Sequence, residues 1–164
     1  MKAVEEADVL IVTTPTYCMH VSAPLKSFID MTFDYWMSHR PNESMFSKRA
    51  VIVSTSAGSS PKPAMKDVQD ALFYLGVPSI IKYGIAVQAK NWDEVNAAKK
   101  EKIDKATTKI AGKLSVNKKP HVGIKTRFII NMMGIMQKKD WSSSPVEKEY
   151  WQQKGWLGSA RPWK

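Results

Sequence analysis

Two runs of apolar, mostly β-branched residues organise the first half of the chain. Val9 to Val12 is unbroken and stops at the Thr13-Thr14-Pro15 breaker, and Ala50 to Ser54 is equally continuous. A short apolar run of this kind predicts a strand that is covered on both faces, as in a parallel sheet. A third strand is predicted within residues 79–88.

Apolar residues at spacings of three and four predict helices after the first two strands. The first helix is predicted over about residues 23–38, with Ser22 as its N-cap, and its apolar stripe is expected to lie on the sheet. The second is predicted over residues 63–75, with Gly76 as its C-terminal cap. Strands that alternate with helices in this way have the order of a βαβ array.

The second half of the chain is predicted to be helical. Residues 91–114 form a lysine-rich segment with a weaker apolar face, which is expected to cover the sheet. Ser144-Pro145-Val146-Glu147 has the form of a capping box, and it opens a short helix that is expected to end at Gly155.

A short apolar segment, Phe128 to Met136, lies between basic residues and allows three interpretations: a dimer contact, a membrane-surface helix, or ordinary core. It is too short to span a bilayer. A helix lying on a membrane would need a clearer polar face than Asn131 and Gly134 provide. We therefore expect this segment to pack against its own or a partner subunit.

Length and composition indicate one ordinary domain with an extension. The 164 residues, of which 43% are hydrophobic, are assigned as an α/β domain over residues 1–117 and a helical C-terminal extension over residues 118–164. The single cysteine, Cys18, excludes an internal disulfide and fits a reducing compartment. Without a long apolar run or the apolar core of a signal peptide at the start, a cytoplasmic protein with no membrane partner is expected.

The net charge of +10 is unevenly distributed along the chain. Residues 1–90 carry nine Lys/Arg against eight Asp/Glu, whereas residues 91–164 carry sixteen against seven. The lysines between Lys99 and Lys113 are interpreted as a solvated helix face, because no aromatic residues interleave with them for base stacking. No nucleic-acid partner is therefore predicted.

The candidate chemistry lies in the turns that follow the first two strands, because ligands of open α/β sheets bind outside the carboxyl ends of the strands. The predicted ligand-contacting residues are Pro15, Thr16, Tyr17, Cys18 and Met19 in the first turn, and Ser56, Ala57, Gly58 and Ser59 in the second. Tyr17 is either a stacking residue or a lid on the core, and Cys18 either tunes a cofactor or is an inert small hydrophobe.

No catalytic side chain and no metal site are predicted. His20, His39 and His121 are scattered without the spacing of metal ligands, and no convincing Ser/His/Asp or Cys/His arrangement is present.

The motifs in residues 7–30 resemble a known family. Ala7-Asp8, Thr14-Pro15-Thr16-Tyr17, Ser22-Ala23-Pro24-Leu25-Lys26 and Phe28-Ile29-Asp30 occur in the order found in the middle of NADPH-dependent FMN reductases, which have a flavodoxin-like, doubly wound parallel sheet. The likeness covers about residues 4–90 well.

This resemblance implies an activity and a site. FMN and NAD(P)H would be the cofactors, and a small molecule such as a flavin, a quinone or a nitro compound would be the acceptor. Pro15 to Met19 would lie along the isoalloxazine ring with its backbone N–H groups on the polar edge, and Ser56 to Ser59 would border the same pocket. A homodimer is also implied.

The predicted sheet is N-terminally incomplete. It has three recognisable strands where a doubly wound sheet has about five, and no phosphate-binding turn precedes the first of them. We expect about fifty to sixty residues to be missing, from about 30 residues per βαβ step. The alternatives to this simplest account are another start site, a cloning boundary or a second chain that supplies the missing elements.

Two other functions remain open. One is a truncated, non-catalytic fragment or interaction module with weak or no cofactor binding. The other is a basic nucleic-acid-binding protein, whose affinity would fall steeply with salt.

Overall fold

The computed structural model describes residues 1–116, 119–141 and 144–164. Its centre is a three-stranded parallel sheet in the order β1-β2-β3, formed by β1 (Val9–Pro15), β2 (Arg49–Ser56) and β3 (Ser79–Ala86). The α-helices are α1 (Lys2–Glu6), α2 (Ala23–Met31), α3 (Lys62–Tyr74), α4 (Ala97–Leu114), α5 (Ile124–Lys138) and α6 (Pro145–Gln153), and 3-10 turns cover Phe33–Tyr35 and Glu43–Ser47. The predicted α/β class, with three parallel strands and a helical C-terminal part, is confirmed.

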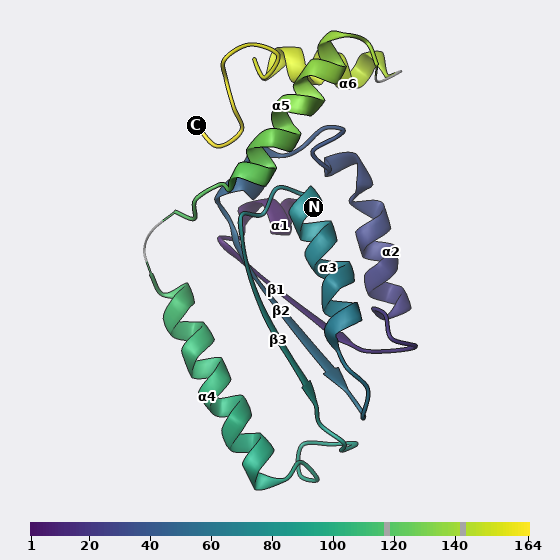
Figure 1. Cartoon of the computed structure of the whole chain (residues 1–164), viewed down its shortest axis with the longest axis vertical. Helices are drawn as coiled ribbons and strands as arrows, with labels where there is room; N and C mark the ends of the chain where they lie inside the picture. The colour runs from purple at the N-terminus through teal and green to yellow at the C-terminus, as the bar shows by residue number, and fades with distance from the viewer. Residues whose placement is uncertain (117–118, 142–143) are drawn as a thin grey trace.

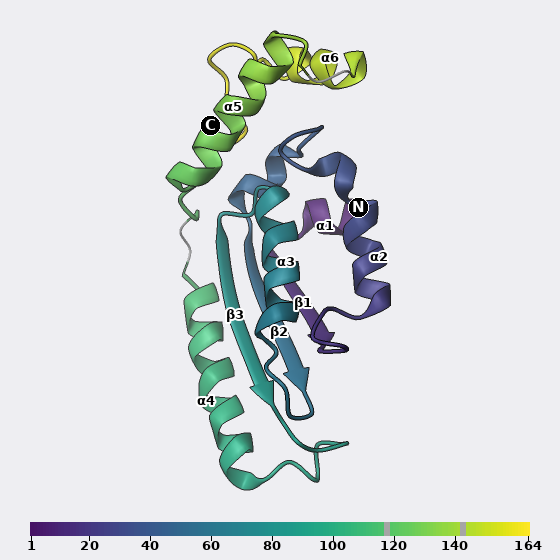
Figure 2. The same cartoon turned by 45° about the vertical axis from the view of Figure 1, so that its right-hand side comes forward.

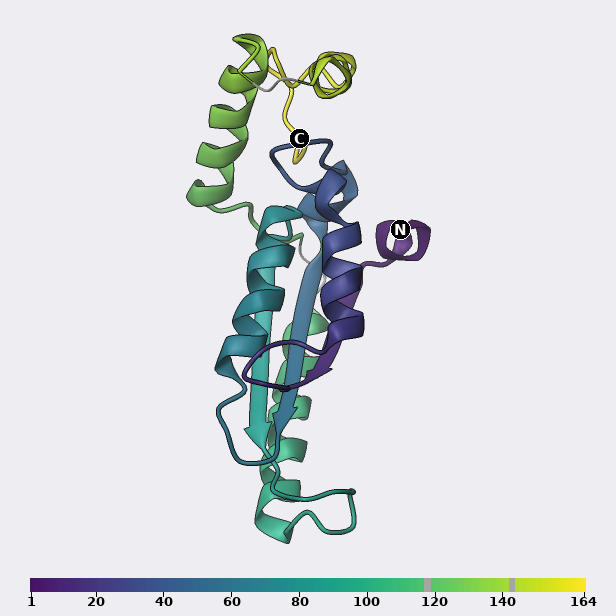
Figure 3. The ribbon, with the colours of Figure 1, turned by 90° about the vertical axis from the view of Figure 1, so that its right-hand side faces the viewer.

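The helices cover the sheet unequally. Figures 1 and 2 show α2 and α3 on one face of the sheet and α4 on the other, with α5 and α6 beyond the end where the strands begin. In Figure 3, α4 is seen behind the strands, on the side of the sheet away from α2 and α3. β1 is an edge strand of this sheet, and its Ile11 is exposed.

The alternation of side chains along β2 divides the molecule into these two layers. Ala50 and Ile52 point to the α3 face and are fully buried, whereas Val51 and Val53 line a cavity beneath α4. Successive strand residues face opposite sides of a sheet, so one apolar run supplies both layers. This explains why the run is continuous rather than alternating.

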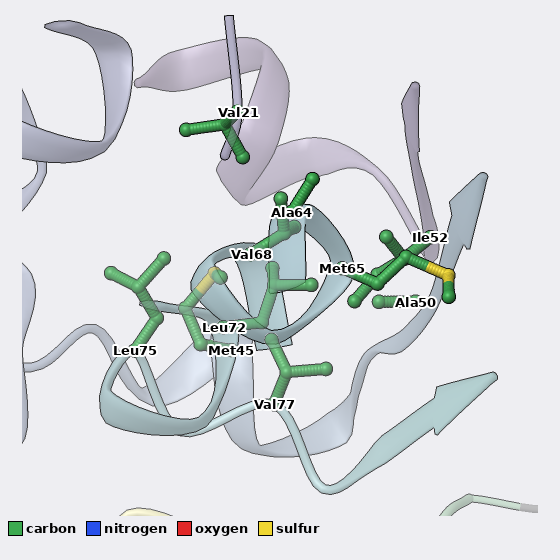
Figure 4. Close-up of a cluster of buried hydrophobic side chains, with 10 residues drawn as sticks. All are labelled: Val21, Met45, Ala50, Ile52, Ala64, Met65, Val68, Leu72, Leu75 and Val77. Carbon is green, nitrogen blue, oxygen red and sulfur yellow. The ribbon is translucent and has the colours of Figure 1, made fainter. Parts of the chain in front are cut away.

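The main core lies between β2 and α3 (Figure 4). The residues of α3 that face the sheet recur at helical spacing, as predicted, and the buried members of the cluster are Val21, Met45, Ala50, Ile52, Ala64, Met65, Val68, Leu72, Leu75 and Val77. Burying each valine, leucine, isoleucine or methionine side chain of this cluster stabilises the fold by about 1.5–3 kcal/mol.

Gly76 ends α3 as the sequence predicts. Its N–H donates to the Phe73 carbonyl (3.0 Å) and the N–H of Val77 donates to the Leu72 carbonyl (3.0 Å), which together form a Schellman motif. Gly76 has a φ of +99°, which favours glycine because no Cβ obstructs that conformation.

A second cluster joins the C-terminal helices to the rest of the fold. Met37 and Phe46, from the segment between α2 and β2, pack with Val122, Ile130, Trp151 and Trp156. The indole N–H of Trp151 donates to the His39 carbonyl (2.6 Å). The domain boundary predicted at residues 117 and 118 lies outside the described residues, so the division into two units stays a prediction.

The first helix is shorter than predicted. α2 ends at Met31 rather than near residue 38, because the Thr32 hydroxyl donates to the Ile29 carbonyl (2.7 Å) and the chain continues as a 3-10 turn. Phe33 lies beyond the end of α2 and is exposed, and Phe28, within α2, is also exposed, although their spacing placed both on the sheet-facing stripe.

The predicted start of α4 needs correction, whereas α6 begins at Pro145 as predicted and only its capping box is wrong. α4 begins at Ala97 rather than at residue 91, because the Asn96 side chain accepts from the Lys99 N–H (2.9 Å) as an N-cap. Ser144 is the N-cap of α6, but its side chain forms no capping bond, and the Glu147 carboxylate pairs instead with Nδ1 of His39 (2.7 Å). None of the described helices is long and apolar enough to cross a membrane.

The C-cap of α3 provides a test of the core. A Cβ at Gly76 would lie within 2.7–2.9 Å of Phe46 ring atoms. We therefore expect Gly76→Ala to lower the free energy of unfolding by about 2 kcal/mol or more, from overpacking and a left-handed backbone. Urea denaturation measures this, and Gly112→Ala is the control, because it lies in α4 with nothing within 4 Å. Equal stability of Gly76→Ala and the wild type would contradict the packing described.

Candidate functional site

The parallel register brings the predicted turns together at one edge of the sheet. Pro15 pairs with Thr55, and the N–H of Thr16 donates to the Thr55 carbonyl (2.8 Å). The Thr16 and Ser54 hydroxyls lie 3.0 Å apart. The turns after β1 and β2 therefore start side by side, as their positions in the sequence predict.

The turn after β1 is a tight hairpin-like bend. The N–H of Tyr17 donates to the His20 carbonyl (3.0 Å), and the N–H of His20 donates to the Tyr17 carbonyl (2.9 Å). Cys18 and Met19 both have positive φ, 48° and 71°, which is the conformation of a type I′ turn. Left-handed backbone costs a non-glycine residue roughly 1–2 kcal/mol, so the surrounding structure must hold this turn in place.

α3 supplies part of that support. Oδ2 of Asp67 lies 2.9 Å from Nδ1 of His20 and accepts from the N–H of Val21 (3.4 Å). On the other side, the N–H of Ser22 donates to the Thr14 hydroxyl (3.3 Å). The turn is thus fixed to α3 and β1, and its tip points outward.

The tip leaves two backbone donors open. Within the described part of the chain, the N–H groups of Cys18 and Met19 have no protein acceptor, and both residues are exposed. Pro15 has no N–H, and those of Thr16 and Tyr17 are used internally. The prediction that this turn offers amides to a ligand is thereby narrowed to two of its five residues.

The turn after β2 is closed by a side-chain hydrogen bond and has exposed backbone N–H groups without acceptors. The Ser56 hydroxyl donates to the Ser59 carbonyl (2.5 Å) and is buried, so it closes the turn. Ala57, Gly58 and Ser59 are exposed, and their N–H groups have no acceptor among the described residues. The turn leads into α3, whose N-terminus carries partial positive charge. These groups suit an anion.

The structure decides between the two interpretations of the Tyr17 side chain, and it shows the surroundings of Cys18. Tyr17 is 63% exposed, so it does not act as a lid on the core, and Cys18 is exposed rather than packed among apolar groups. Among the residues that the structure describes, no group of three or more His, Cys, Asp or Glu side chains could hold a metal ion.

A large apolar groove on the α4 face was not predicted from the sequence. It has a volume of about 660 Å³, and its walls include Val51, Val53, Tyr83, Ile85 and, from α4, Ile103. The Tyr83 hydroxyl is buried in this region with no partner among the described residues, and burial raises the pKa of its phenol. Alternate residues of β2 and β3 line the groove, but a strand that is apolar at every position does not show in its sequence which residues face which side.

The comparisons decide the family. The family model described as NADPH-dependent FMN reductase matches residues 1–91, more than half of the chain. The chain belongs to this family. The match contains both turns and all three strands, so it confirms the resemblance stated from residues 7–30.

Other comparisons add less. A search of the curated proteins found no match. The Trp repressor binding protein from Bacillus subtilis is a solved structure with 18% sequence identity and a TM-score of 0.40, and the alignment covers 51% of this chain. The same alignment covers 59% of the Bacillus subtilis protein, so the present chain, an FMN reductase family member, spans less than two thirds of that protein's length.

The partnerless Tyr83 hydroxyl leads to a prediction about stability. A buried polar group without a hydrogen bond costs about 1–3 kcal/mol, so Tyr83→Phe is expected to raise the free energy of unfolding by about 1 kcal/mol. The control is Tyr150→Phe, which removes a bond to the Pro41 carbonyl (2.7 Å) and is expected to lower it. Urea denaturation of both variants at pH 7 measures the two effects.

The pH dependence of Tyr83→Phe follows from the raised pKa. Above pH 10.0, the ordinary pKa of a tyrosine, the unfolded chain loses the Tyr83 proton while the folded chain retains it, so wild-type stability falls as the pH rises. The advantage of Tyr83→Phe is therefore expected to grow above pH 10. A variant less stable than the wild type would show that the hydroxyl is bonded.

Proposed function

We propose that this protein is an FMN-dependent NAD(P)H oxidoreductase that passes reducing equivalents to a small acceptor such as free flavin, a quinone or a nitro compound. Family membership supports flavin-dependent redox chemistry. The observation that carries the proposal is the pair of outward N–H groups at Cys18 and Met19, next to an open turn at the same edge of the sheet.

The first turn has the chemistry that the edge of a flavin ring requires. The ring edge carries carbonyl and nitrogen acceptors, which match the N–H groups of Cys18 and Met19. The exposed Tyr17 side chain adds a flat apolar surface with a polar tip. Because α3 and β1 fix this turn, it would bind the ring without first having to become ordered.

The second turn would hold an anionic part of a cofactor. Ala57, Gly58 and Ser59 offer N–H groups in the turn that leads into α3, and the dipole of this helix also favours negative charge near its N-terminus. Lysines are not needed for this, and the charge of residues 1–90 is nearly balanced.

The protein would bind and orient rather than transfer protons. When bound, FMN supplies the redox chemistry, since it accepts hydride from the nicotinamide and passes the electrons on. The described residues of the two turns would position it through their open backbone N–H groups. This agrees with the absence of a predicted catalytic side chain.

The homodimer and the cytoplasmic location implied above stay predictions. The alternative of a non-catalytic fragment or interaction module predicts that the purified chain binds FMN weakly or not at all, so a titration that gives tight FMN binding distinguishes the oxidoreductase from it.

The contribution of Tyr17 can be measured by the quenching of FMN fluorescence during titration. We expect the wild type to bind FMN and Tyr17→Ala to bind it about tenfold more weakly, because an aromatic contact contributes about 0.5–1.5 kcal/mol. Met31→Ala is the control, since Met31 is exposed on α2, away from both turns. Absence of FMN binding by the wild type would refute the proposed function.

A negative charge in the second turn tests its role. A Cβ at Gly58 meets nothing within 4 Å, so Gly58→Asp is expected to fold normally and to weaken FMN or NADPH binding by roughly tenfold through repulsion. Gly58→Ala separates charge from volume, and Gly112→Asp controls for net charge. If Gly58→Asp binds both cofactors like the wild type, this turn does not contact an anion.

A further inference from the structure

α5 has two different faces. Its inner face, with Thr126, Ile130, Gly134 and Gln137, is buried against the second cluster. Its outer face exposes four large apolar side chains that recur at intervals of four, four and three residues: Ile124 (85% exposed), Phe128 (65%), Met132 (38%) and Ile135 (52%). We refer to these four residues as the outer stripe.

Basic residues flank the outer stripe on both sides. At 3.6 residues per turn, Lys125 lies on one side of the stripe and Arg127 and Lys138 lie on the other. Lys139 follows the helix, with its Nζ 4.9 Å from the ring centroid of the exposed Trp141. Apolar residues bordered by long cationic side chains, with a tryptophan nearby, are typical of helices that lie at a membrane surface.

A small hollow adjoins the stripe. It has a volume of about 160 Å³, and Ile135, Asn131, Lys138 and Arg161 are among the residues that line it. Arg161 is held in place, since its Nε donates to Oδ1 of Asn131 (3.0 Å) and its guanidinium also donates to the Gly158 carbonyl (2.8 Å). The cationic side chains of Lys138 and Arg161 thus line the same hollow beside the outer stripe.

Charge argues against a second copy as the partner of this face. Between Asp104 and Asp140 the sequence has nine Lys/Arg and no acidic residue. Two α5 helices laid against each other would therefore bring like charges together in either orientation, which is destabilising. The carboxylates closest in sequence are occupied, Asp140 by Lys148 and Glu147 by His39.

We propose that the outer stripe of α5 docks on an anionic lipid surface, with its apolar side chains at the boundary between head groups and acyl chains and its flanking cations among the head groups. This revises the sequence expectation, which rejected a membrane-surface helix because Asn131 and Gly134 provide too weak a polar face; in the structure the polar border of the stripe is formed by Lys125, Arg127 and Lys138 instead. In the structure, Gly134 lies on the packed side, where an added Cβ would be 3.7 Å from Trp151, so it does not interrupt the outer stripe.

The arrangement of the fold is compatible with such docking. α5 lies beyond the end of the sheet where the strands begin, whereas the turns after β1 and β2 lie at the opposite end (Figures 1 and 2). A surface that covers the outer stripe would leave both turns accessible. The inference therefore does not depend on the proposed function.

Co-sedimentation with lipid vesicles tests the proposal. We expect the wild type to bind vesicles of phosphatidylcholine mixed equally with phosphatidylglycerol at least tenfold more tightly than vesicles of phosphatidylcholine alone, and to be released by salt. Phe128→Glu is expected to reduce binding to the mixed vesicles at least tenfold. Met31→Glu adds the same charge to an exposed methionine of α2 and is expected to bind like the wild type.

Three results would overturn the proposal. The first is no binding to the mixed vesicles by a wild type that circular dichroism shows to be folded. The second is equal binding by Phe128→Glu and the wild type. The third is a dimer in light scattering that Phe128→Glu dissociates, since a second copy would then cover the stripe. Weaker binding of the double variant Lys138→Gln/Lys139→Gln, with the stripe intact, would support the role of the cations.

Discussion

The hydrogen-bonded register of β2 with its two parallel neighbours is the constraint on which both the core and the candidate site depend. Thr55 is paired with Pro15 on one side and with Ile85 on the other. A shift by one residue would turn Ala50 and Ile52 away from α3, because successive side chains face opposite sides of the sheet. It would also break the bond from Thr16 to Thr55 that positions the first turn. Core packing and site geometry are therefore fixed by the same pairing.

Sequence patterns predicted the elements that depend on local chemistry. The strands follow from continuous β-branched runs, and the end of α3 follows from Gly76, whose positive φ the sequence implies. The predictions that failed concern competing long-range or side-chain bonds. Glu147 appeared to complete a capping box, but its partner is His39, 108 residues away in the chain. No window of local periodicity contains such a contact.

The location of the candidate site was predictable, but its detailed chemistry was not. Parallel strands place their following turns at one edge, so Pro15–Met19 and Ser56–Ser59 had to be neighbours. Which amides remain open is decided by tertiary bonds. Thr16 gives its N–H to Thr55, and the Ser56 hydroxyl turns back to Ser59, so both residues brace the turns. The groove beside Tyr83 could not be predicted, because strands that are covered on both faces show no alternation of apolar and polar residues in the sequence.

The uneven charge of the chain has a structural counterpart. The nearly neutral first 90 residues contain the two turns, where open backbone N–H groups and the N-terminus of α3 carry partial positive charge. The excess of basic side chains belongs to the later residues, and those of α5 lie at the other end of the sheet (Figure 1). Because screening limits exposed charges to about 10 Å at ordinary ionic strength, lysines at that end contribute little to binding at the turns. The charge of these α5 residues acts on a partner that contacts the outer stripe. Binding at the turns and docking through α5 are therefore electrostatically independent.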